Sequence, residues 1–397
     1  MQMKGALQGL RVLDVGNDVS APFAASLFGD MGADVVKIEK PTCGDTSRKL
    51  EPKVGSESAQ YVNFNRSKRG ITLDLEKGKD VFLDLVKTAD VVVENFYPGY
   101  LKEIGLGYEV LQAVNPGVIL LSISCYGQTG PYSGRKKYND MIAQAMSGVM
   151  SVTGFPGDRP VRCGAPMADI IAGLNGAMGV LAAIHYRRKT GRGQWIDVAT
   201  TDSAAQTLAS VNQNYLTNGY SPQRQGNGYA ASAPGGGYRS KDGFIIFSTN
   251  GEKNWQLLCQ CINRTDLIER PEFINNEMRV KNRPLIDGII EEYTITKTTD
   301  ELLEEMLAKG FAAAPVLTID QIVQDEHISG VRNMFPKIEH PALGEVRVTN
   351  QAIKMSSGDP EPQRPSPLMG QHNEEILCGE LGYTEEKMAE LARSGVI

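Results

Sequence analysis

The first half of the chain alternates short apolar runs with helical patterns, and this alternation constrains the fold more than any other feature. The predicted strands are residues 10–15, 34–39, 90–93, 118–124 and 195–199, and the helices predicted among them are 21–31, 77–88 and 108–114. Repeated strand–helix–strand units with right-handed crossovers build a parallel sheet covered by helices. The pattern therefore predicts an α/β fold with a doubly wound, Rossmann-like parallel sheet.

A stretch rich in Gly, Asn, Ser and Pro, residues 218–237, predicts a domain boundary. The region beyond it is mixed, which indicates a smaller α+β domain. Its predicted elements are strands at 243–248 and 314–318 and a helix at 299–309; another strand at 344–348 and two short amphipathic helices within 374–393 follow.

Composition excludes several classes of protein. The apolar share of 41% and the charged share of 22% are typical of a folded globular chain, so dominant disorder is excluded. The net charge of −6 lacks the basic surplus of a nucleic-acid binder. The six cysteines include no C-x-x-C pair and the four histidines form no close pair, so we expect no metal site.

No segment of the sequence predicts export or membrane insertion. Residues 1–14 lack the apolar core of a signal peptide, and the scattered cysteines are typical of a reducing compartment. The best candidate for a membrane span, residues 170–186, contains several glycines and lies between Asp169 and Arg187. A buried helix accounts for this run better. We therefore expect a cytoplasmic protein that binds no membrane.

The N-terminal strand, turn, helix and second strand have the outline of a dinucleotide-binding unit. The second strand ends in an acid, Glu39, at about the expected offset from Asp14. The turn from Gly16 to Pro22, however, lacks the G-x-G-x-x-G that lets backbone approach a pyrophosphate. NAD and FAD are therefore disfavoured. Either this is an ordinary α/β edge, or a different nucleotide-bearing ligand binds at the carboxyl ends of the strands.

Several motifs, in the same order along the chain, resemble the class III (formyl-CoA/carnitine-type) coenzyme A transferases. They are Val35–Pro41 with Gly44-Asp45, Val93–Gly99, Tyr126–Tyr132, Tyr138-Asn139-Asp140 with Gln144–Gly148, Ala168–Gly173, Lys189–Gln194 and Leu381–Glu386. The resemblance runs from about Leu10 to the C-terminus. It implies that coenzyme A moves from an acyl-CoA to a small carboxylic acid, with CoA as a substrate and no permanently bound cofactor.

The resemblance also implies an architecture. Members of this family form interlocked homodimers in which each chain threads through a hole in the other. N- and C-terminal parts together build the large, CoA-binding domain, which would comprise residues 1–215 and 330–397 here. The small domain would comprise residues 225–325.

Asp169 follows Pro166 at the predicted start of the long apolar helix. The helix dipole favours an anion there, and by itself the position is typical of a first-turn acid. The resemblance implies more: Asp169 is the nucleophile that attacks the acyl-CoA and then carries CoA as an aspartyl thioester. We also expect N–H groups of this helix terminus to contact the developing oxyanion.

Asn139 bears on a competing enzymatic activity. The family fold is shared with α-methylacyl-CoA racemases, whose catalytic histidine occupies this position directly before an aspartate. Asparagine is neither an acid nor a base near pH 7, which disfavours a racemase. A 2-methylacyl-CoA racemase or isomerase remains the alternative enzyme, and a non-catalytic CoA-binding protein is the third hypothesis.

Candidate CoA-binding residues follow from their places in the family motifs. They are Val19, Ser20, Lys40, Asn95, Phe96, Tyr97, Lys136, Lys137, Tyr138, Asn139 and Asp140. Lys40 stands where the family often has arginine, and Glu103 stands where several members carry a basic residue. Glu103 therefore weakens the expected phosphate site at that point.

Two further segments allow two interpretations each. Gly235, Gly236 and Gly237 form either a flexible linker or a mobile substrate loop that closes over the aspartyl intermediate. The basic residues Arg66, Lys68 and Arg69 form either a solvated surface or phosphate contacts.

Overall fold

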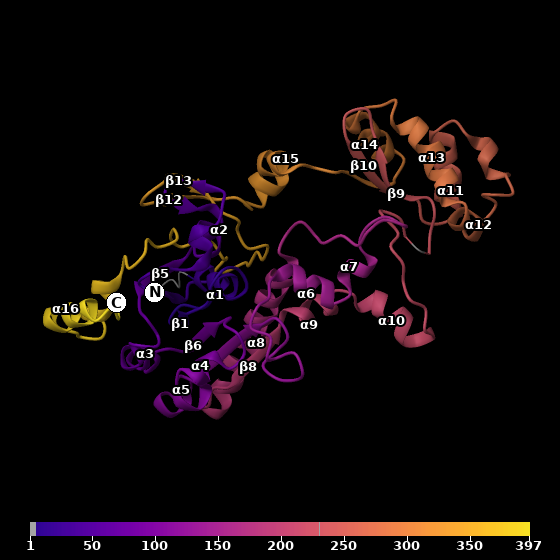
Figure 1. Ribbon diagram of the computed structural model, residues 1–397. Coiled ribbons are helices and arrows are strands. Elements are labelled where there is room, and N and C mark those ends of the chain that lie inside the picture. The colour runs from indigo at the N-terminus through magenta and orange to yellow at the C-terminus, as the bar shows by residue number, and fades with distance from the viewer. Residues whose placement is uncertain (1–4, 230) are drawn as a thin grey trace. The chain divides into compact units, whose positions relative to one another are not determined.

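The computed structural model describes residues 5–229 and 231–397, which form two compact units (Figure 1). Unit 1 comprises the chain as far as Val149, Arg162–Gln213 and Asp325–Ile397. Unit 2 comprises Met150–Val161 and Asn214–Gln324. The short excursion Met150–Val161 thus belongs to unit 2, whereas the family resemblance assigned these residues to the large domain.

Unit 1 is built on a six-stranded parallel sheet. Its strands are β1 (Arg11–Asp14), β2 (Asp34–Glu39), β5 (Lys68–Thr72), β6 (Val91–Glu94), β7 (Ile119–Ser124) and β8 (Trp195–Ala199). They lie in the order β5-β2-β1-β6-β7-β8, and every neighbouring pair is parallel. The direction of the strand order reverses between β1 and β6. In open α/β sheets, ligands bind outside the carboxyl ends of the strands at such a switch point.

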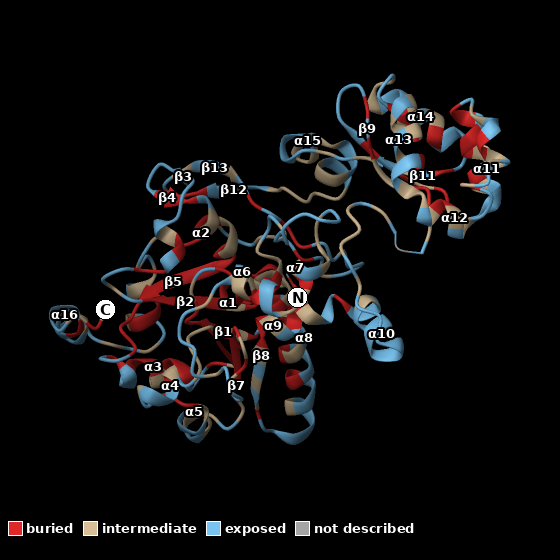
Figure 2. Cartoon of the chain, turned by 45° about the vertical axis from the view of Figure 1, so that its right-hand side comes forward, coloured by how far each residue is buried: buried red, intermediate tan, exposed pale blue. Residues whose placement is uncertain are grey.

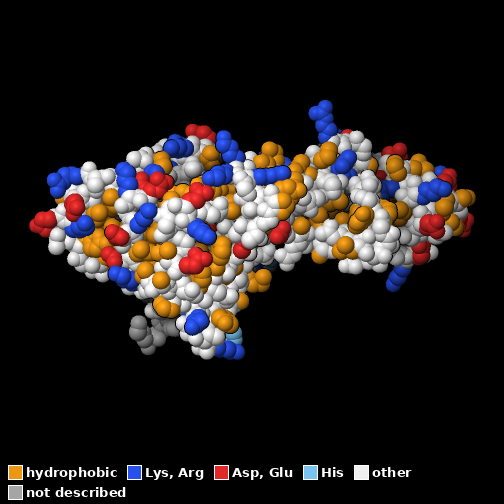
Figure 3. Space-filling model, turned by 60° about the horizontal axis from the view of Figure 1, so that its bottom comes forward, with side chains coloured by type: hydrophobic (Ala, Val, Ile, Leu, Met, Phe, Trp, Pro, Cys, Tyr) orange, Lys and Arg blue, Asp and Glu red, His pale blue; other side chains and the backbone are white. Residues whose placement is uncertain are grey.

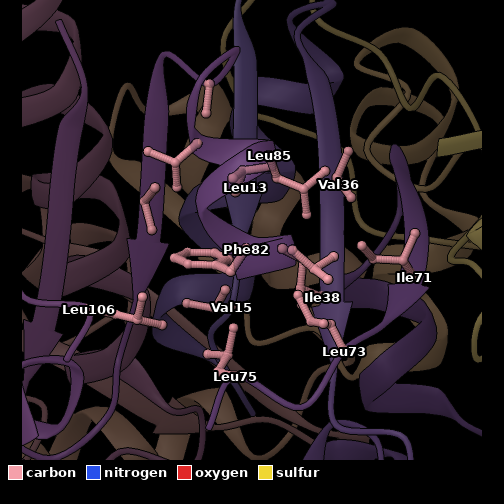
Figure 4. Close-up of a cluster of buried hydrophobic side chains, with 14 of the residues drawn as sticks. Leu13, Val15, Val36, Ile38, Ile71, Leu73, Leu75, Phe82, Leu85 and Leu106 are labelled. Carbon is pink, nitrogen blue, oxygen red and sulfur yellow. The ribbon is translucent and has the colours of Figure 1, made fainter. Parts of the chain in front are cut away.

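Helices cover both faces of this sheet. The main ones are α1 (Ser20–Asp30) and α8 (Met167–Thr190) on one face and α3 (Lys79–Val86) and α5 (Tyr108–Val114) on the other. Figure 4 shows Phe82 of α3 among Leu13 of β1, Val15 directly after β1 and Ile38 of β2. These residues are each less than 5% exposed, so the sheet is buried as the apolar runs predict.

Helix α8 is the long apolar helix, and it is buried on one face only (Figure 2). A Cβ at Gly173 would lie 2.8 Å from the Phe23 ring and 3.0 Å from the Ser20 carbonyl oxygen, so glycine permits close packing on α1. Leu174 and Met178 on the opposite face are 47% and 63% exposed. The helix is long and apolar enough to cross a membrane by composition. The prediction of a buried helix is therefore correct for the packed face and wrong for the other.

The basic residues before and within β5 are neither a solvated surface nor a phosphate site. Arg66 and Lys68 are 1% and 0% exposed, and Arg69 is 7% exposed. The Arg66 guanidinium lies 2.6 Å from the Asp30 carboxylate, and Lys68 Nζ lies 2.7 Å from the Asp14 carboxylate. Both earlier interpretations are wrong, because acids from distant strands and helices draw these cations into the core.

The remaining elements of unit 1 are short and lie at its edges. They are η1 (Thr46–Lys49), β3 (Lys53–Val54), β4 (Glu57–Ser58), α2 (Ala59–Phe64), α4 (Tyr100–Glu103), α6 (Asp140–Met146), α9 (Thr200–Gln206), η3 (Glu326–Val331), β12 (Lys337–His340), β13 (Gly344–Arg347), η4 (Glu374–Cys378) and α16 (Glu385–Arg393). Helices α7 (Val149–Val152) and α10 (Ala209–Asn218) lie where the chain passes between units.

Unit 2 contains a three-stranded antiparallel sheet in the order β11-β10-β9. Its elements are β9 (Gly235–Arg239), β10 (Phe244–Ser248), α11 (Glu252–Cys261), η2 (Thr265–Ile268), α12 (Asn276–Lys281), α13 (Arg283–Thr294), α14 (Thr299–Ala308), β11 (Ala312–Pro315) and α15 (Ile319–Gln324). Tyr238, Phe247 and Trp255 belong to its separate core.

The glycines at 235–237 are part of strand β9 and not a loop. Gly235, Gly236 and Gly237 pair in register with residues of β10. A Cβ at Gly237 would lie 2.8 Å from Asn227 Nδ2, so the missing side chain lets Asn227 pack on the strand. The loop prediction is wrong because the ladder to β10 orders this backbone.

Candidate active site

A cavity of about 380 Å³ opens in unit 1 at the carboxyl ends of β1 and β6. Its lining residues are Asn17, Asp18, Val19, Ser20, Asn95, Tyr97, Lys136, Lys137, Tyr138, Asn139 and Asp169. The structure thus brings Asp169 together with most of the predicted CoA-binding residues. Their shared location is the switch point of the sheet, where a ligand site is expected.

Asn95 joins the loops that follow β1 and β6. Its side-chain amide donates to the Asn17 carbonyl at 2.7 Å, and its Oδ1 accepts from the Asn17 N–H at 2.8 Å. The Tyr138 hydroxyl donates to the Asn95 carbonyl at 2.9 Å. Burial raises the pKa of Tyr138, so this hydroxyl stays protonated at neutral pH. The cavity wall is therefore a hydrogen-bonded scaffold built from three distant segments.

A buried network of charged side chains, centred on Lys37 and Asp45, holds the part of this wall that follows β1. Lys37 donates to the Gly16 carbonyl and lies 2.7 Å from the Asp45 carboxylate. The other Asp45 oxygen accepts from the Asp18 N–H at 3.0 Å, where Asp18 has a φ of +65°. This network was not predicted. The one available signal in the sequence was a lysine, Lys37, between the apolar residues Val36 and Ile38 of β2.

Asp169 is the third residue of α8, and a residue of α6 caps that helix. One oxygen of Asp140 accepts from the N–H groups of Ala168 at 2.8 Å and Asp169 at 3.2 Å. Gln144 donates to the other oxygen at 2.6 Å. The expectation that the N–H groups of this helix terminus face an oxyanion is wrong for Ala168 and Asp169, because Asp140 already accepts from both.

Burial, together with the negative charges of Asp140 and Asp18, raises the pKa of Asp169 to about 7. The helix dipole is worth about 0.3–1 kcal/mol at such a position, which is less than the cost of removing a carboxylate from water. The helix-dipole argument from the sequence favours the anion and so predicts a lowered pKa for Asp169. The pKa is raised instead, so that argument gives the wrong sign for the shift. A half-buried carboxyl with a raised pKa facing a cavity is a typical feature of a functional site.

Two lysines with different surroundings, Lys136 and Lys137, lie at the mouth of the cavity. Lys136 Nζ lies 4.0 Å from the centre of the Tyr97 ring and 3.5 Å from the Glu103 carboxylate. The Tyr97 hydroxyl donates to Glu103 at 2.6 Å and lowers the pKa of that carboxyl. Glu103 therefore offsets part of the Lys136 charge. Lys137 is exposed at the same rim.

The other predicted residues lie outside this cavity or serve another contact. Lys40 is about half exposed and lies 3.3 Å from the Asp74 carboxylate. The Phe96 ring packs against Tyr100 with a centroid separation of 4.6 Å. Asn139 lines the cavity, but its Oδ1 caps α6 by accepting from the backbone N–H of Ile142, the third residue of that helix. Gly235–Gly237 belong to unit 2.

On the face that Figure 3 shows, acidic and basic side chains are interspersed. Among residues 5–229 and 231–397, no group of three His, Cys, Asp or Glu side chains is placed to hold a metal ion.

Comparison with known proteins relates this chain to enzymes of one chemistry. The sequence pattern of CoA-transferase family III matches residues 7–373. Human succinyl-CoA:glutarate CoA-transferase is 32% identical over 394 residues, covering 98% of this chain and 90% of that protein. The succinyl-CoA–L-malate CoA-transferase alpha subunit of Chloroflexus aurantiacus is 35% identical over 397 residues, covering 98% and 92%.

The fold agrees with this relationship. The crystal structure of a CaiB/BaiF family protein from Brucella suis superposes with a TM-score of 0.86 at 34% identity, covering 94% of this chain and 99% of that one. The parallel sheet and the relatives of this chain together identify it as a CoA-transferase, an enzyme that moves CoA between organic acids. The chain belongs to CoA-transferase family III.

The raised pKa of Asp169 predicts a pH dependence. A nucleophilic role for Asp169, which is proposed below, requires the ionised carboxylate, so kcat/KM should rise tenfold per pH unit below about 7 and level off above it. In the Asp18→Asn variant the rise should move to lower pH, because a neighbouring negative charge is removed. Asparagine tolerates the positive φ at this position. Rate profiles from pH 5 to 9 measure both effects, and an unmoved profile in the variant would argue against this coupling.

Proposed function

We propose that the enzyme carries CoA as a covalent aspartyl thioester on Asp169 during transfer from an acyl-CoA to a carboxylic acid. The observation that carries this proposal is the Asp169 carboxyl at the switch-point cavity, partly removed from water and near its ionisation point at neutral pH. A desolvated carboxylate is a better nucleophile than a hydrated one, and covalent catalysis depends on such positioning.

The proposed steps balance without ATP. Asp169 Oδ attacks the thioester carbonyl, the C–S bond breaks, and a mixed anhydride and CoA thiolate form. The thiolate attacks the aspartyl carbonyl and releases the donor as a carboxylate, which leaves aspartyl-CoA. The acceptor carboxylate attacks this thioester to form a second anhydride, and the thiolate then takes the acceptor acyl group. Asp169 ends as a free carboxylate.

For substrates we propose succinyl-CoA as donor and a small dicarboxylic acid as acceptor. The support is the naming of the relatives, which act on succinyl-CoA with glutarate or L-malate. Lys137 at the rim offers a cation to CoA phosphates, whereas Lys136 is already partly neutralised. We further propose an interlocked homodimer and a cytoplasmic location, as the family resemblance and the free cysteines suggest.

The alternative enzyme, a 2-methylacyl-CoA racemase, is not supported by the geometry. Asn139 stands where the racemases have their catalytic histidine, and its side-chain oxygen accepts a hydrogen bond that caps α6. Deuterium exchange at the α-carbon of a 2-methylacyl-CoA would favour the racemase. CoA binding without either reaction would favour a binding protein.

Trapping the intermediate tests the covalent route. Incubation with succinyl-CoA and no acceptor should load Asp169, and hydroxylamine should convert the thioester to a hydroxamate. Mass spectrometry of the peptide spanning 163–187 should show the modification, which should disappear when glutarate is added. Recovery of only unmodified peptide under rapid quench, from an enzyme that turns over well, would replace this route with a ternary mechanism.

A further inference from the structure

Gln144 is a buried polar residue close to the active site that takes no part in the proposed steps. It lies in the second turn of α6, four residues after Asp140, and is 0% exposed. It does not line the cavity around Asp169, so we expect no contact with substrate. Burying an amide is costly unless its polar atoms are paired, so the partners of Gln144 indicate its role.

Both ends of the Gln144 amide are engaged. Its Nε2 donates to one oxygen of the Asp140 carboxylate at 2.6 Å and to the Ala165 carbonyl at 3.4 Å. Its Oε1 accepts from the Cys163 N–H at 2.8 Å. Residues 163–165 lead directly into α8. Gln144 therefore ties the segment before α8 to α6 and also holds the carboxylate that caps α8.

The start of α8 depends on this arrangement because it has no cap of its own. Pro166 directly precedes the helix, and its side chain makes no capping hydrogen bond. The other oxygen of Asp140 accepts instead from the N–H groups of Ala168 and Asp169. If the Asp140 carboxylate rotated, these bonds would break, and the backbone that carries the Asp169 carboxyl would lose its fixed position.

We propose that Gln144 is a positioning residue for the transfer reaction: it fixes the Asp140 carboxylate in the orientation that caps α8, and so sets the place of the Asp169 carboxyl in the cavity. This inference rests on the proposed role of Asp169. An amide suits the task because it presents a donor to the carboxylate and an acceptor to the N–H at once. An ionised carboxylate at position 144 would present acceptors only, whereas a protonated carboxyl group would again present both.

Gln144→Glu makes this contact depend on a proton. Two carboxyl groups in hydrogen-bond contact at a buried site can share one proton, and its loss leaves two like charges that repel. At low pH the shared proton should restore the contact, and at higher pH repulsion should turn the Asp140 carboxylate away from α8. Between pH 5 and 9 the kcat/KM of this variant should pass through a maximum and then fall at least about tenfold, whereas the wild-type value should level off.

Gln144→Met keeps the length of the side chain and removes both polar ends at every pH. Its kcat should fall about tenfold to a hundredfold, since a displacement of about 1 Å can cost about a hundredfold, while KM should stay within about twofold. The fall at high pH should be absent.

Gln112→Glu is the matched control. Gln112 also donates to a residue one turn earlier in its own helix, Tyr108 of α5, and it lies outside the cavity around Asp169. This variant adds the same charge as Gln144→Glu and should reproduce the wild-type pH profile.

Several outcomes would overturn the proposal. They are a kcat of Gln144→Met within about twofold of wild type, a Gln144→Glu profile that levels off like that of wild type, and the same fall at high pH in Gln112→Glu. A fall that coincides with loss of the near-ultraviolet circular dichroism signal would also overturn it, because Gln144 would then serve folding only.

The trapping experiment tests the covalent route separately. If no aspartyl thioester forms but Gln144→Glu still loses activity at high pH while folded, the covalent route fails and the positioning of Asp169 by Gln144 stands. If the thioester forms and the Gln144→Glu profile matches wild type, the covalent route stands and the positioning role fails.

Discussion

Replacing Asp169 with alanine is expected to lower kcat for transfer by at least about a thousandfold, because the covalent route then lacks its only nucleophile. Steady-state assays with succinyl-CoA and glutarate measure the loss. The Kd for CoA should stay close to the wild-type value by calorimetry, since the scaffold of Asn95 and Tyr138 does not depend on the Asp169 side chain.

Asp202 provides a matched control for this substitution. It is also an acid in the first turn of a helix, α9, but it is exposed and lies outside the cavity. Asp202→Ala should retain near-normal activity. If Asp169→Ala kept more than a few per cent of the activity in a preparation free of wild-type enzyme, Asp169 would be an orienting group and not the nucleophile.

Lys68→Met should destabilise unit 1 by about 3–5 kcal/mol, because it breaks a fully buried ion pair. The Asp14 carboxylate would keep only Lys37, 3.7 Å away, as its cation. The carbonyl groups of Pro22 and Phe64 would also lose the donor that they share. Urea unfolding of protein that contains 5-fluorotryptophan, followed by the fluorine resonance of Trp195 in the same unit, measures the change in the free energy of unfolding.

Lys40→Met is the control for burial. Its ammonium pairs with Asp74 at the surface, and exposed pairs of this kind contribute about 0–1 kcal/mol. The two variants remove the same charge and introduce the same side chain. Equal losses of stability would contradict the assignment of Lys68 to a buried network.

Much of the sheet could be predicted because its signal is local. The runs that form β1, β2 and β7 each contain at least two consecutive apolar residues, as a strand buried on both faces requires. Strand β5 was missed because it begins with Lys68 and Arg69. Their burial depends on acids far away in the chain, which no local pattern contains.

The residues of the active site likewise divide into those that local motifs reveal and those that depend on distant contacts. Asp169 and the rim lysines are found from motifs, since each motif is a contiguous stretch of sequence. Asp18 faces the cavity because of its positive φ and its contact with Asp45, and neither is visible in a pattern of residue types. The wrong prediction of oxyanion contacts at the N-terminus of α8 has the same cause, because the acceptor for the Asp169 N–H is the Asp140 carboxylate on the separate helix α6.

The capping contact of Asn139 bears on how easily this protein could change its reaction. Histidine is a poor helix cap, and losing an asparagine cap costs about 1 kcal/mol. Asp140 occupies the first turn of the helix that Asn139 caps, so fraying there would release the clamp on the start of α8. A histidine introduced at position 139 for proton transfer would thus make the position of the neighbouring Asp169 carboxylate less fixed. An evolutionary path toward racemisation would first need a new cap for α6.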